Sequence, residues 1–559
     1  LAGVRKSVAW VVYLSVSCLF VYEGKGREPS FGPSGGAGGC VKGAGGGGVP
    51  ATGDGSGDLG GLLGYWAAAT PSAPALTWVP FDGPPVPWTY AALRHDVSRL
   101  AAGLARRGVR AGDAVALVMP NCPDVVLVWA ALLQLGAVAV CADPRSSAAE
   151  LGYVLEHSRA VGAVVDPVVT ARAREPLDKL PWVVESSGRP EVGRGTGLLM
   201  ADPPAGWATV PAQAPASIQY TSGTTSRPKA VVWTQANCLW AGRVGAAHQG
   251  LTQADTNLVH LPLFHTNALS YSLLSTLFAG GHVVLQPRFS ASRFWPVAVE
   301  HGATWSALVS FCVRALQTRE PLPGHRFRGW GNSAALDPAP WSGGVAALGW
   351  FGMTETVSHP IIGSLDPPDP PGTMGRPARE YAVAVLHPDG SPVGAGEVGD
   401  LRVRGIPGVS LFAEYLRDPE ATAAAVDADG WLRTGDRVRL NEGGTLSFVE
   451  REGDLLKVGG ENVGAAEIER VLLQVPGVAE VAVVGAPHEM LGEVPVAFVL
   501  PRAGASVIVA EAEARCVAGL SPLRRPREIR IVSELPRVTL DKVAKAVLRG
   551  ILREEGVRR

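Results

Sequence analysis

Cysteine is scarce and scattered in this chain of 559 residues. Its 7 cysteines form no C-x-x-C pair and no Cys/His cluster with the spacing of metal ligands. An odd number of dispersed thiols is typical of a protein from a reducing compartment, so we expect neither a disulfide framework nor a structural zinc site.

Net charge is also nearly absent, because 50 Lys and Arg residues balance 51 Asp and Glu residues to give a formal net charge of −1. Proteins whose main partner is nucleic acid or an anionic membrane surface usually carry an excess of basic residues. The balance argues against both partner classes. Any anion binding must therefore be local, at a few well-placed groups.

Long hydrophobic runs are missing as well. The apolar run at 8–22 follows Arg5 and Lys6, as in a secretory signal, but it is short for a membrane span and no small-residue cleavage site follows it. Glycine dominates residues 35–61, a composition typical of a flexible linker. We interpret residues 1–57 as a disordered or artefactual extension, with a working signal as the alternative. We expect a cytoplasmic protein without stable membrane insertion.

The remaining chain alternates between strand and helix patterns. A length of 559 residues with 47% apolar residues predicts two or more domains. From residue 58 onward, short apolar runs are followed by amphipathic helical patterns, which predicts an α/β layered domain with parallel strands. After residue 372 the pattern becomes β-rich. The strands expected there span 381–386, 400–404 and 445–449.

Residues 220–230 read YTSGTTSRPKA and lie between predicted strands at 216–219 and 230–233. Hydroxyl groups and backbone N–H groups in such a loop suit a polyphosphate, because both donate hydrogen bonds to phosphate oxygens. The residues expected to do so are Thr221, Ser222, Gly223, Thr224 and Thr225, with a positive charge from Lys229. The loop is not a Walker P-loop, since Pro228 and Ala230 stand where that motif needs Gly and Ser or Thr.

This loop resembles the phosphate loop of the adenylate-forming superfamily, which includes acyl-CoA ligases, peptide-synthetase adenylation domains and luciferases. It departs from the usual form at Ser226 and Ala230, where that form has Gly. Further segments extend the resemblance from about residue 58 to 549. They are LPLFHTN at 261–267, GNSAA at 331–335, WFGMTET at 350–356, GWLRTGD at 430–436, VGGENV at 458–463 and LPRVTLDKV at 535–543. The chain looks closest to the crotonobetaine/carnitine-CoA ligase-like group.

The resemblance implies an α/β fold in two domains. The large N-terminal adenylation domain, with layered α/β subdomains and a β-rich subdomain, would span 58–450. A hinge at 451–454 would lead to a small, mobile C-terminal α+β domain at 455–559, which bears a lysine. Gly453 replaces the usual Asp or Lys of this hinge, and glycine leaves rotation open.

The resemblance also implies roles for single residues. Near the nucleotide, Ser333 and Ala334 would contact adenine, Phe351 would stack on it, and Asp436 with Arg451 would bind the ribose. Thr354 would bond a phosphate and Glu355 would hold Mg²⁺. The remaining assignments are His265 at the acyl pocket, Gly459 and Gly460 along the pantetheine tunnel after domain rotation, and Lys542 as the residue that drives adenylation.

These features favour an enzyme that uses ATP, Mg²⁺ and CoA to activate a small carboxylic acid as an acyl-adenylate and pass it to CoA. A second hypothesis keeps the adenylation but has a carrier protein as acceptor, or an unusual small acid such as nitrite as substrate. A third, a catalytically silent nucleotide-binding protein, is disfavoured because Lys229, Glu355, Asp436, Arg451 and Lys542 are all retained. The sequence leaves the acid, the acceptor and the oligomeric state open.

Overall fold

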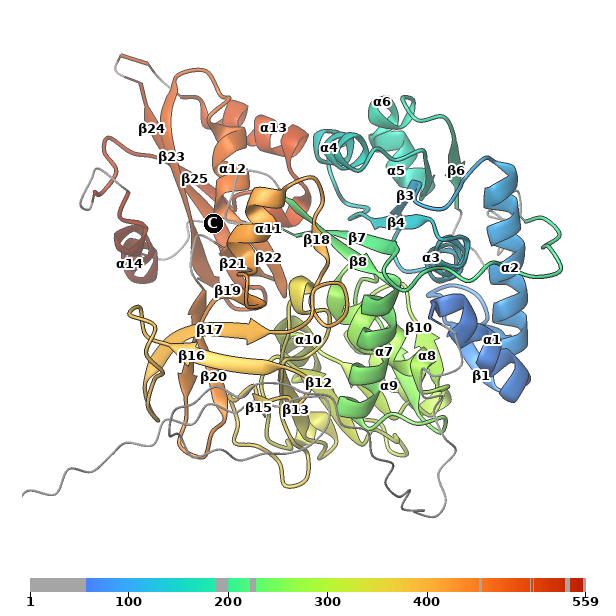
Figure 1. The fold of residues 1–559 in the computed structure, drawn as a ribbon. Helices are drawn as coiled ribbons and strands as arrows, with labels where there is room; N and C mark the ends of the chain where they lie inside the picture. The colour runs from blue at the N-terminus through green and yellow to red at the C-terminus, as the bar shows by residue number, and fades with distance from the viewer. Residues whose placement is uncertain are drawn as a thin grey trace, which may run out of the picture.

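The structure, a computed structural model, describes residues 57–186, 200–221, 228–451, 455–502, 504–505, 507–537 and 543–555. The expectations for residues 1–56, for most of the phosphate loop and for Lys542 fall outside these ranges. Figure 1 shows a large body that begins with α1 and a smaller C-terminal unit beside it, next to α4. The first described helix, α1 (Leu59–Ala69), begins where the sequence predicted order, with the Asp58 side chain as its N-cap.

One seven-stranded sheet carries the hairpin that flanks the phosphate loop. Its strands in spatial order are β18 (Glu414–Tyr415), β8 (Lys229–Thr234), β7 (Pro215–Thr221), β4 (Val138–Cys141), β3 (Ala114–Val118), β5 (Gly162–Val165) and β6 (Val183–Glu185). Strands β7, β4, β3, β5 and β6 run parallel, as the strand–helix alternation predicted. The pairs β7–β8 and β8–β18 are antiparallel.

A nine-stranded sheet forms the second layer. Its order is β15 (Arg376–Pro377), β14 (Ile361–Ile362), β13 (Ala347–Phe351), β12 (Gly329–Asn332), β11 (Trp305–Ala307), β9 (Thr256–Val259), β10 (His282–Leu285), β1 (Pro74–Trp78) and β2 (Val86–Thr89). The run from β13 to β1 is parallel, and the outer strands β2, β14 and β15 pair antiparallel. Both sheets contribute to one large hydrophobic core.

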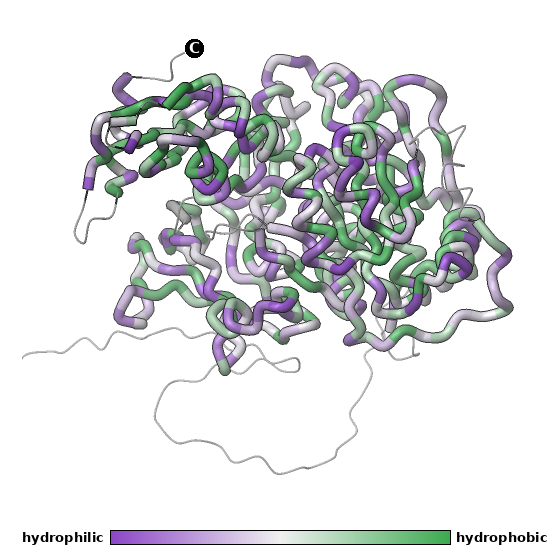
Figure 2. Tube along the Cα trace, turned by 90° about the horizontal axis from the view of Figure 1, so that it is seen from above, coloured by the Kyte–Doolittle hydropathy of each residue, from purple (hydrophilic) through white to green (hydrophobic). Residues whose placement is uncertain are grey.

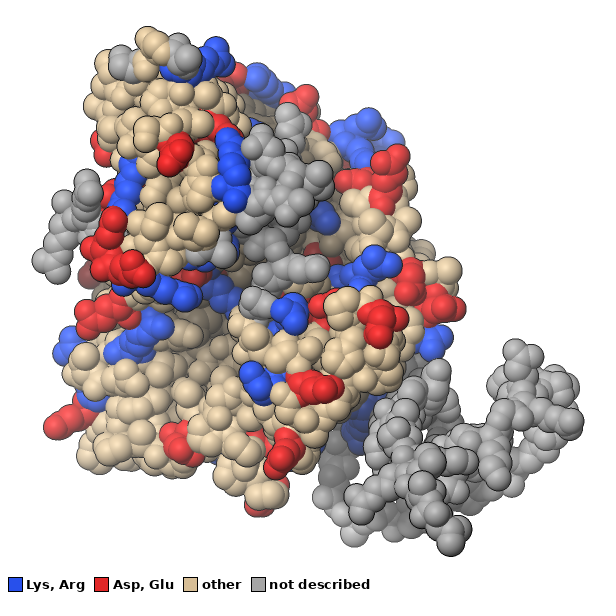
Figure 3. Space-filling view, turned by 90° about the vertical axis from the view of Figure 1, so that its left-hand side faces the viewer, with Lys and Arg blue, Asp and Glu red and all other residues tan. Residues whose placement is uncertain are grey.

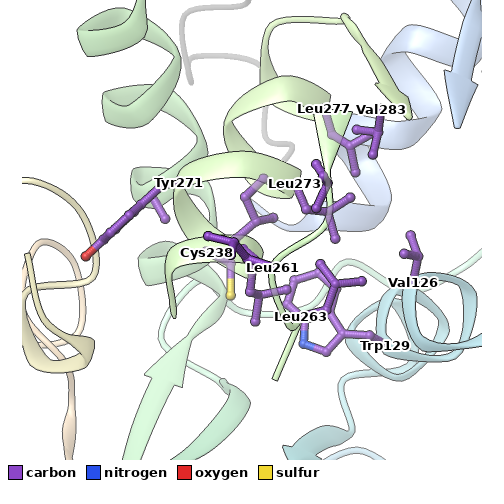
Figure 4. Close-up of a cluster of buried hydrophobic side chains, with 14 of the residues drawn as sticks. Val126, Trp129, Cys238, Leu261, Leu263, Tyr271, Leu273, Leu277 and Val283 are labelled. Atoms are coloured by element: carbon purple, nitrogen blue, oxygen red, sulfur yellow. The ribbon is translucent and has the colours of Figure 1, made fainter. Parts of the chain in front are cut away.

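Helices fill the space between and outside these sheets. They are α2 (Tyr90–Arg106), α3 (Pro123–Leu135), α4 (Ala148–Ser158), α5 (Pro167–Arg172), α6 (Arg174–Leu177), α7 (Gln235–Gln249), α8 (Ser275–Phe278), α9 (Ala291–Glu300), α10 (Ser310–Leu316) and α11 (Pro419–Ala425). Figure 4 shows the packing that results, with Trp129 of α3 and Cys238 of α7 against side chains of the 261–283 segment. Within the described part of the chain, no helix is long and apolar enough to cross a membrane.

One predicted helix differs from expectation. The pattern at 269–278 predicts a continuous helix, but the chain is wound as a π-helix, η3 (Asn267–Leu274), before α8. The backbone N–H of Ser275, directly after η3, donates to the carbonyl of Ser270, five residues earlier. The Ser275 hydroxyl donates to the same carbonyl at 2.9 Å. Apolar periodicity reports which face is buried and not which carbonyl each N–H reaches, so the wider turn was invisible in the sequence.

The β-rich expectation holds for a four-stranded antiparallel sheet, β16 (Ala382–Leu386), β17 (Val398–Arg404), β19 (Trp431–Leu440) and β20 (Leu446–Arg451). The C-terminal sheet has the order β22 (Glu461–Gly464), β21 (Leu455–Val458), β24 (Gly492–Pro501), β23 (Val478–His488), and β25 (Glu528–Ile531) also pairs with β24. Helices α12 (Ala465–Leu472) and α13 (Val509–Gly519) pack on one of its hydrophobic clusters, and α14 (Lys545–Glu555) packs on another.

The C-terminal unit has apolar segments of its own inside it and lies against one side of the larger body, as the hydropathy tube in Figure 2 shows. Lys and Arg side chains are interspersed with Asp and Glu side chains over the face drawn in Figure 3. That distribution agrees with the formal net charge of −1 and with anion binding at local sites.

Candidate active site

The β7–β8 hairpin places Lys229 directly after the phosphate loop. Thr221, the last residue of β7, pairs with Lys229, the first residue of β8. The Lys229 ammonium lies 4.6 Å from the centroid of the Tyr415 ring, a cation–π contact with a side chain of the neighbouring strand β18. Ser222, Gly223, Thr224 and Thr225 lie outside the described residues. Helix α7 begins directly after β8, with Thr234 as its N-cap in a capping box.

Tyr415 also binds the predicted metal ligand. Its hydroxyl donates to Oε1 of Glu355 at 2.8 Å, and the Glu355 side chain is buried. Tyr415 therefore joins the cation of Lys229 to the carboxylate of Glu355. Nothing in the sequence around Tyr415 indicated that its ring and its hydroxyl contact two different site residues.

Thr354 and Glu355 stand on a short 3₁₀ turn, η5 (Thr354–Thr356), after β13. Three contacts fix that turn. The Trp233 indole N–H donates to the Thr354 carbonyl at 2.8 Å, the Thr266 hydroxyl donates to the Thr354 hydroxyl at 2.9 Å, and the Phe412 N–H donates to the Glu355 carbonyl at 2.9 Å. Elements far apart in sequence thus hold Thr354 and Glu355 beside Lys229.

The donor set at Glu355 fits a hard cation such as Mg²⁺. A carboxylate has about four lone-pair sites, and one hydroxyl donor leaves most of them for a metal. The described residues contain no cluster of three or more His, Cys, Asp or Glu side chains suited to a metal. Magnesium usually takes only one or two carboxylates and completes its shell with phosphate oxygens and water, so a lone Glu355 is consistent with it.

The residues predicted for adenine come from adjacent parallel strands. Asn332 of β12 pairs with Gly349 of β13, so Ser333 and Ala334 follow one strand end and Phe351 lies at the other. Ser333 donates its backbone N–H to the Asn332 side chain at 2.7 Å, which shapes the turn. Nucleotides bind at the carboxyl ends of strands in open α/β sheets, and these residues occupy such an edge.

The predicted ribose residues are brought together. Asp436 on β19 pairs with Arg451 on β20, which places them opposite each other in the β-rich sheet. The Asp436 side chain is buried, and its backbone N–H donates to the Thr434 hydroxyl at 3.1 Å. The Arg451 side chain lies outside the described residues.

His265 faces a residue of the C-terminal unit. Its Nε2 lies 3.6 Å from Oε2 of Glu461, and Oε1 of Glu461 accepts a bond from Arg145 at 2.6 Å. Burial alone would raise the pKa of Glu461, but His265 and Arg145 outweigh it and lower that pKa to about 2. No sequence pattern indicated that Glu461, within the VGGENV segment, pairs with Arg145, because the two positions lie far apart in the chain.

The Gly459–Gly460 turn lies beside Glu461 on the same side. Gly460 has φ +90°, and a Cβ there would lie 3.0 Å from the Val309 side chain, which follows β11. The predicted tunnel residue Gly460 therefore lies close to Val309, just after the end of β11. A side chain at Gly460 would be disfavoured both by the backbone angle and by this contact.

A second contact holds the two units together. Arg524 of the C-terminal unit lies between Oε1 of Glu150 on α4, at 2.7 Å, and Oε2 of Glu467 on α12, at 3.2 Å. The hydroxyl of Ser147, the N-cap of α4, donates to the carbonyl of Gly519 at 3.0 Å. Both contacts place α4 against the C-terminal unit, as Figure 1 shows.

Lys542 lies outside the described residues, but its described neighbours lie at the other edge of the C-terminal sheet. Arg537 pairs with Val543 and forms an ion pair with Glu480 of β23 at 2.5 Å. Strand β23 is the edge strand opposite β22, which carries Glu461. Lys545, the lysine nearest to the predicted one, is bound to Glu469 at 2.6 Å.

The site combines a cation and hydroxyls suited to phosphates with a carboxylate suited to Mg²⁺, and the C-terminal unit brings a glycine turn to it. These features define a nucleotide-dependent ligase of the adenylate-forming class. The chain belongs to the AMP-binding enzyme family, since residues 63–416 match that family and residues 467–542 match the AMP-binding enzyme C-terminal domain. A similar curated protein is the crotonobetaine/carnitine–CoA ligase of Salmonella paratyphi C (strain RKS4594), 30% identical over 486 residues, 83% of this chain and 93% of that protein.

Two solved structures of one enzyme, the o-succinylbenzoate CoA synthetase of Bacillus subtilis, are similar to this chain at 28% identity. The complex of a double mutant with its product analogue OSB-NCoA has a TM-score of 0.75 and covers 88% of this chain and 98% of its own. The complex with AMP has a TM-score of 0.61 and covers 88% and 98%. Because nearly the same polypeptide is compared twice, the higher score reflects a closer arrangement of its parts.

Proposed function

We propose that this enzyme activates a small carboxylic acid with ATP to an acyl-adenylate, releases pyrophosphate, and then transfers the acyl group to CoA as a thioester. The observation that carries the proposal is the placement of Lys229 and Glu355 on the two functional groups of Tyr415, next to Thr354. The family and its CoA-ligase relatives support CoA as acceptor over a carrier protein. A reaction that needs ATP and CoA also fits a cytoplasmic location.

The first half-reaction must overcome repulsion between a carboxylate and a triphosphate. Attack of a carboxylate oxygen on the α-phosphorus forms the mixed anhydride, and pyrophosphate leaves. The Lys229 ammonium would stabilise the negative charge of the leaving pyrophosphate, and the Thr354 hydroxyl would bind a phosphate oxygen. Glu355 would hold Mg²⁺, which supplies further positive charge to the phosphates when bound. By resemblance, Lys542 would bridge the carboxylate and the α-phosphate.

In the second half-reaction the CoA sulfur attacks the acyl carbonyl and AMP leaves. The contacts between the two units support the assignment of the arrangement seen here to the thioester-forming half-reaction. Glu461 and the Gly459–Gly460 turn lie at His265 and Val309, while the described neighbours of Lys542 lie at the opposite sheet edge. The higher similarity to the OSB-NCoA complex supports the same assignment. We propose a hinge at 451–454 between units at 58–450 and 455–559. Rotation about it would replace the face with Gly459, Gly460 and Glu461 by the face with Lys542.

Pyrophosphate release across a panel of acids, with and without CoA, tests the proposal. We expect ATP-dependent release with at least one acid, and a thioester only when CoA is added. A final product that forms without CoA would exclude the ligase and favour the alternative of another acceptor or of an unusual small acid such as nitrite. Absence of ATP binding by the purified protein would contradict the proposal altogether.

A further inference from the structure

Three buried polar side chains beside the WFGMTET segment have atoms without a hydrogen-bond partner among the described residues. They are the hydroxyl of Tyr271, the hydroxyl of Ser358 and both ring nitrogens of His359. The exposed fractions of these residues are 4%, 0% and 0%. Buried polar groups in proteins are nearly always paired, because an unpaired group loses its hydrogen bonds to water without compensation. These four atoms lie close together, and a polar group brought among them would form hydrogen bonds that the described residues do not provide.

The position of Tyr271 ties this group to the active site. A Cβ at Gly352 would lie 2.2 Å from the Tyr271 hydroxyl and 2.8 Å from the Ser358 carbonyl, so both residues contact the Gly352 backbone. Gly352 stands between Phe351, predicted to stack on adenine, and the turn with Thr354. Figure 4 shows the Tyr271 ring pointing away from the other labelled side chains, with its hydroxyl at the far end. The Tyr271 hydroxyl therefore lies outside that hydrophobic cluster.

The group is aromatic and uncharged. The His359 ring stacks on Trp350 with centroids 4.6 Å apart and lies 4.0 Å from the Tyr271 ring. Burial, and to a smaller extent nearby His248, lowers the pKa of His359 well below its usual value, so its ring is neutral at pH 7. A neutral imidazole has one donor and one acceptor nitrogen. Together with two hydroxyls, it offers donors and acceptors without net charge.

The backbone holds these side chains in place. The Ser270 hydroxyl of η3 donates to the carbonyl of Val357 at 2.6 Å and so joins the π-helix to the segment with Ser358 and His359. Val357 has φ +63°, a conformation that β-branched residues rarely adopt. The π-helix that differs from the sequence expectation is therefore the element that brings Tyr271 to His359.

We propose that Tyr271, Ser358 and His359 form the acid-binding end of the active site and select a small acid that carries a neutral hydrogen-bonding group, such as a hydroxyl, away from its carboxylate. An alkyl chain would leave the polar atoms unpaired, and sites built to bind a hydroxyl strongly reject analogues that lack it. This inference rests on the proposed acid activation and narrows its substrate class.

The test compares acids that differ only by OH and CH₃. Pyrophosphate release is measured for 4-hydroxybutanoate against pentanoate and for 3-hydroxybenzoate against 3-methylbenzoate. We expect the wild-type enzyme to use the hydroxy acid of at least one pair with kcat/KM about 100-fold higher. Preference for the methyl acid in both pairs would overturn the inference while leaving acid activation intact. Absence of release with every acid, with ATP and Mg²⁺ present, would overturn the proposed function and this inference with it.

Variants then assign the preference to the residues. Tyr271→Phe and Ser358→Ala should each lower kcat/KM for the preferred hydroxy acid by about 10- to 100-fold and leave that for the methyl acid within about threefold. Tyr90→Phe is the matched control, because its buried hydroxyl binds the Gly281 carbonyl at 2.7 Å, in another part of the core. It should leave the ratio of the two acids unchanged. An equal loss for both acids in Tyr271→Phe and Ser358→Ala would contradict the inference.

Discussion

At the scale of single residues, Tyr415 has two separable functions. Its ring makes a cation–π contact with the Lys229 ammonium, and its hydroxyl donates a hydrogen bond to the Glu355 carboxylate. The ring contact is electrostatic attraction to the aromatic face, whereas the hydroxyl contact is a hydrogen bond to a charged group. A substitution that keeps the ring and removes the hydroxyl therefore tests whether the position of Glu355 matters for adenylation.

Tyr415→Phe should slow pyrophosphate release by about 10-fold, because a hydrogen bond to a charged group is worth about 1.5–3 kcal/mol. Tyr415→Ala should slow it further, since the Lys229 contact is lost as well. Initial rates at saturating acid and varied Mg²⁺ are the measurement, with Tyr90→Phe as control. Unchanged rates and Mg²⁺ dependence in Tyr415→Phe would show that Tyr415 does not position Glu355.

At the scale of elements, the packing of α7 on the start of α8, directly after the π-helix, is unusually close. A Cβ at Gly245 of α7 would lie 1.9 Å from the Ser275 hydroxyl, which is already bonded to Ser270. Alanine is normally favoured over glycine within a helix by about 1 kcal/mol. Here the clash opposes that preference, so the sign of the change in the free energy of unfolding tests this packing.

Gly245→Ala should lower the free energy of unfolding by about 1–3 kcal/mol through overpacking. The loss should be smaller in a Ser275→Ala background, because the nearest atom is then gone. Chemical denaturation of the single and double variants measures the loss of unfolding free energy in each background. Gly64→Ala in α1 is the control, because the atom nearest to the new Cβ would be Nε of Arg94 at 3.8 Å. Stabilisation by Gly245→Ala would contradict the close packing.

Much of this element-scale picture could be predicted from the sequence. Strand Val138–Cys141 and helix Ala148–Ser158 have the bounds that their apolar patterns indicate, because burial on one face or both leaves a period in the chain. Motif order singled out Phe351, Thr354 and Glu355, and the structure places them at the end of β13 and on the turn that follows it. Tyr415, Tyr271 and Glu461 were not assigned, since each acts through a partner distant in sequence, and pairings of that kind leave no local pattern.

At the scale of the whole molecule, two ion-pair groups join the C-terminal unit to the larger body. Arg145 and His265 bind Glu461 at the active site, and Glu150 binds Arg524 beside α4. These pairs are partly shielded from water, most of all the pair of Arg524 with Glu150, and breaking such a pair from one side leaves a charge that solvent only partly compensates. These contacts should therefore favour the arrangement seen here over one in which the Lys542 face meets the acid.

Glu461→Gln should slow thioester formation from supplied acyl-AMP and CoA by about 10-fold or more, while pyrophosphate release changes little. The pKa of Glu461 is lowered to about 2, so its contribution is present above the ordinary value near 4.5 and is lost only as the pH falls toward 2. Between pH 6 and 9 the effect of Glu461→Gln should not vary. The matched control is Glu175→Gln, which removes an exposed pair with Lys179. Equal slowing of both half-reactions would contradict a specific role in the thioester step.

Lys542→Ala should give the reverse result. The resemblance assigns Lys542 to adenylation, and the described residues on either side of it, Arg537 and Val543, lie at the sheet edge opposite Glu461. Loss of its positive charge should reduce pyrophosphate release by at least about 100-fold, a magnitude typical for removal of one group that stabilises transition-state charge. Thioester formation from supplied acyl-AMP should remain within about threefold of wild type, and Lys545→Ala should affect neither step strongly.

Because Glu461→Gln and Lys542→Ala then impair opposite half-reactions, a mixture of the two proteins supplied with ATP, acid and CoA should form thioester faster than either alone, provided that acyl-AMP is released into solution. Loss of both half-reactions in Lys542→Ala would exclude an exchange of two faces by one rotating unit.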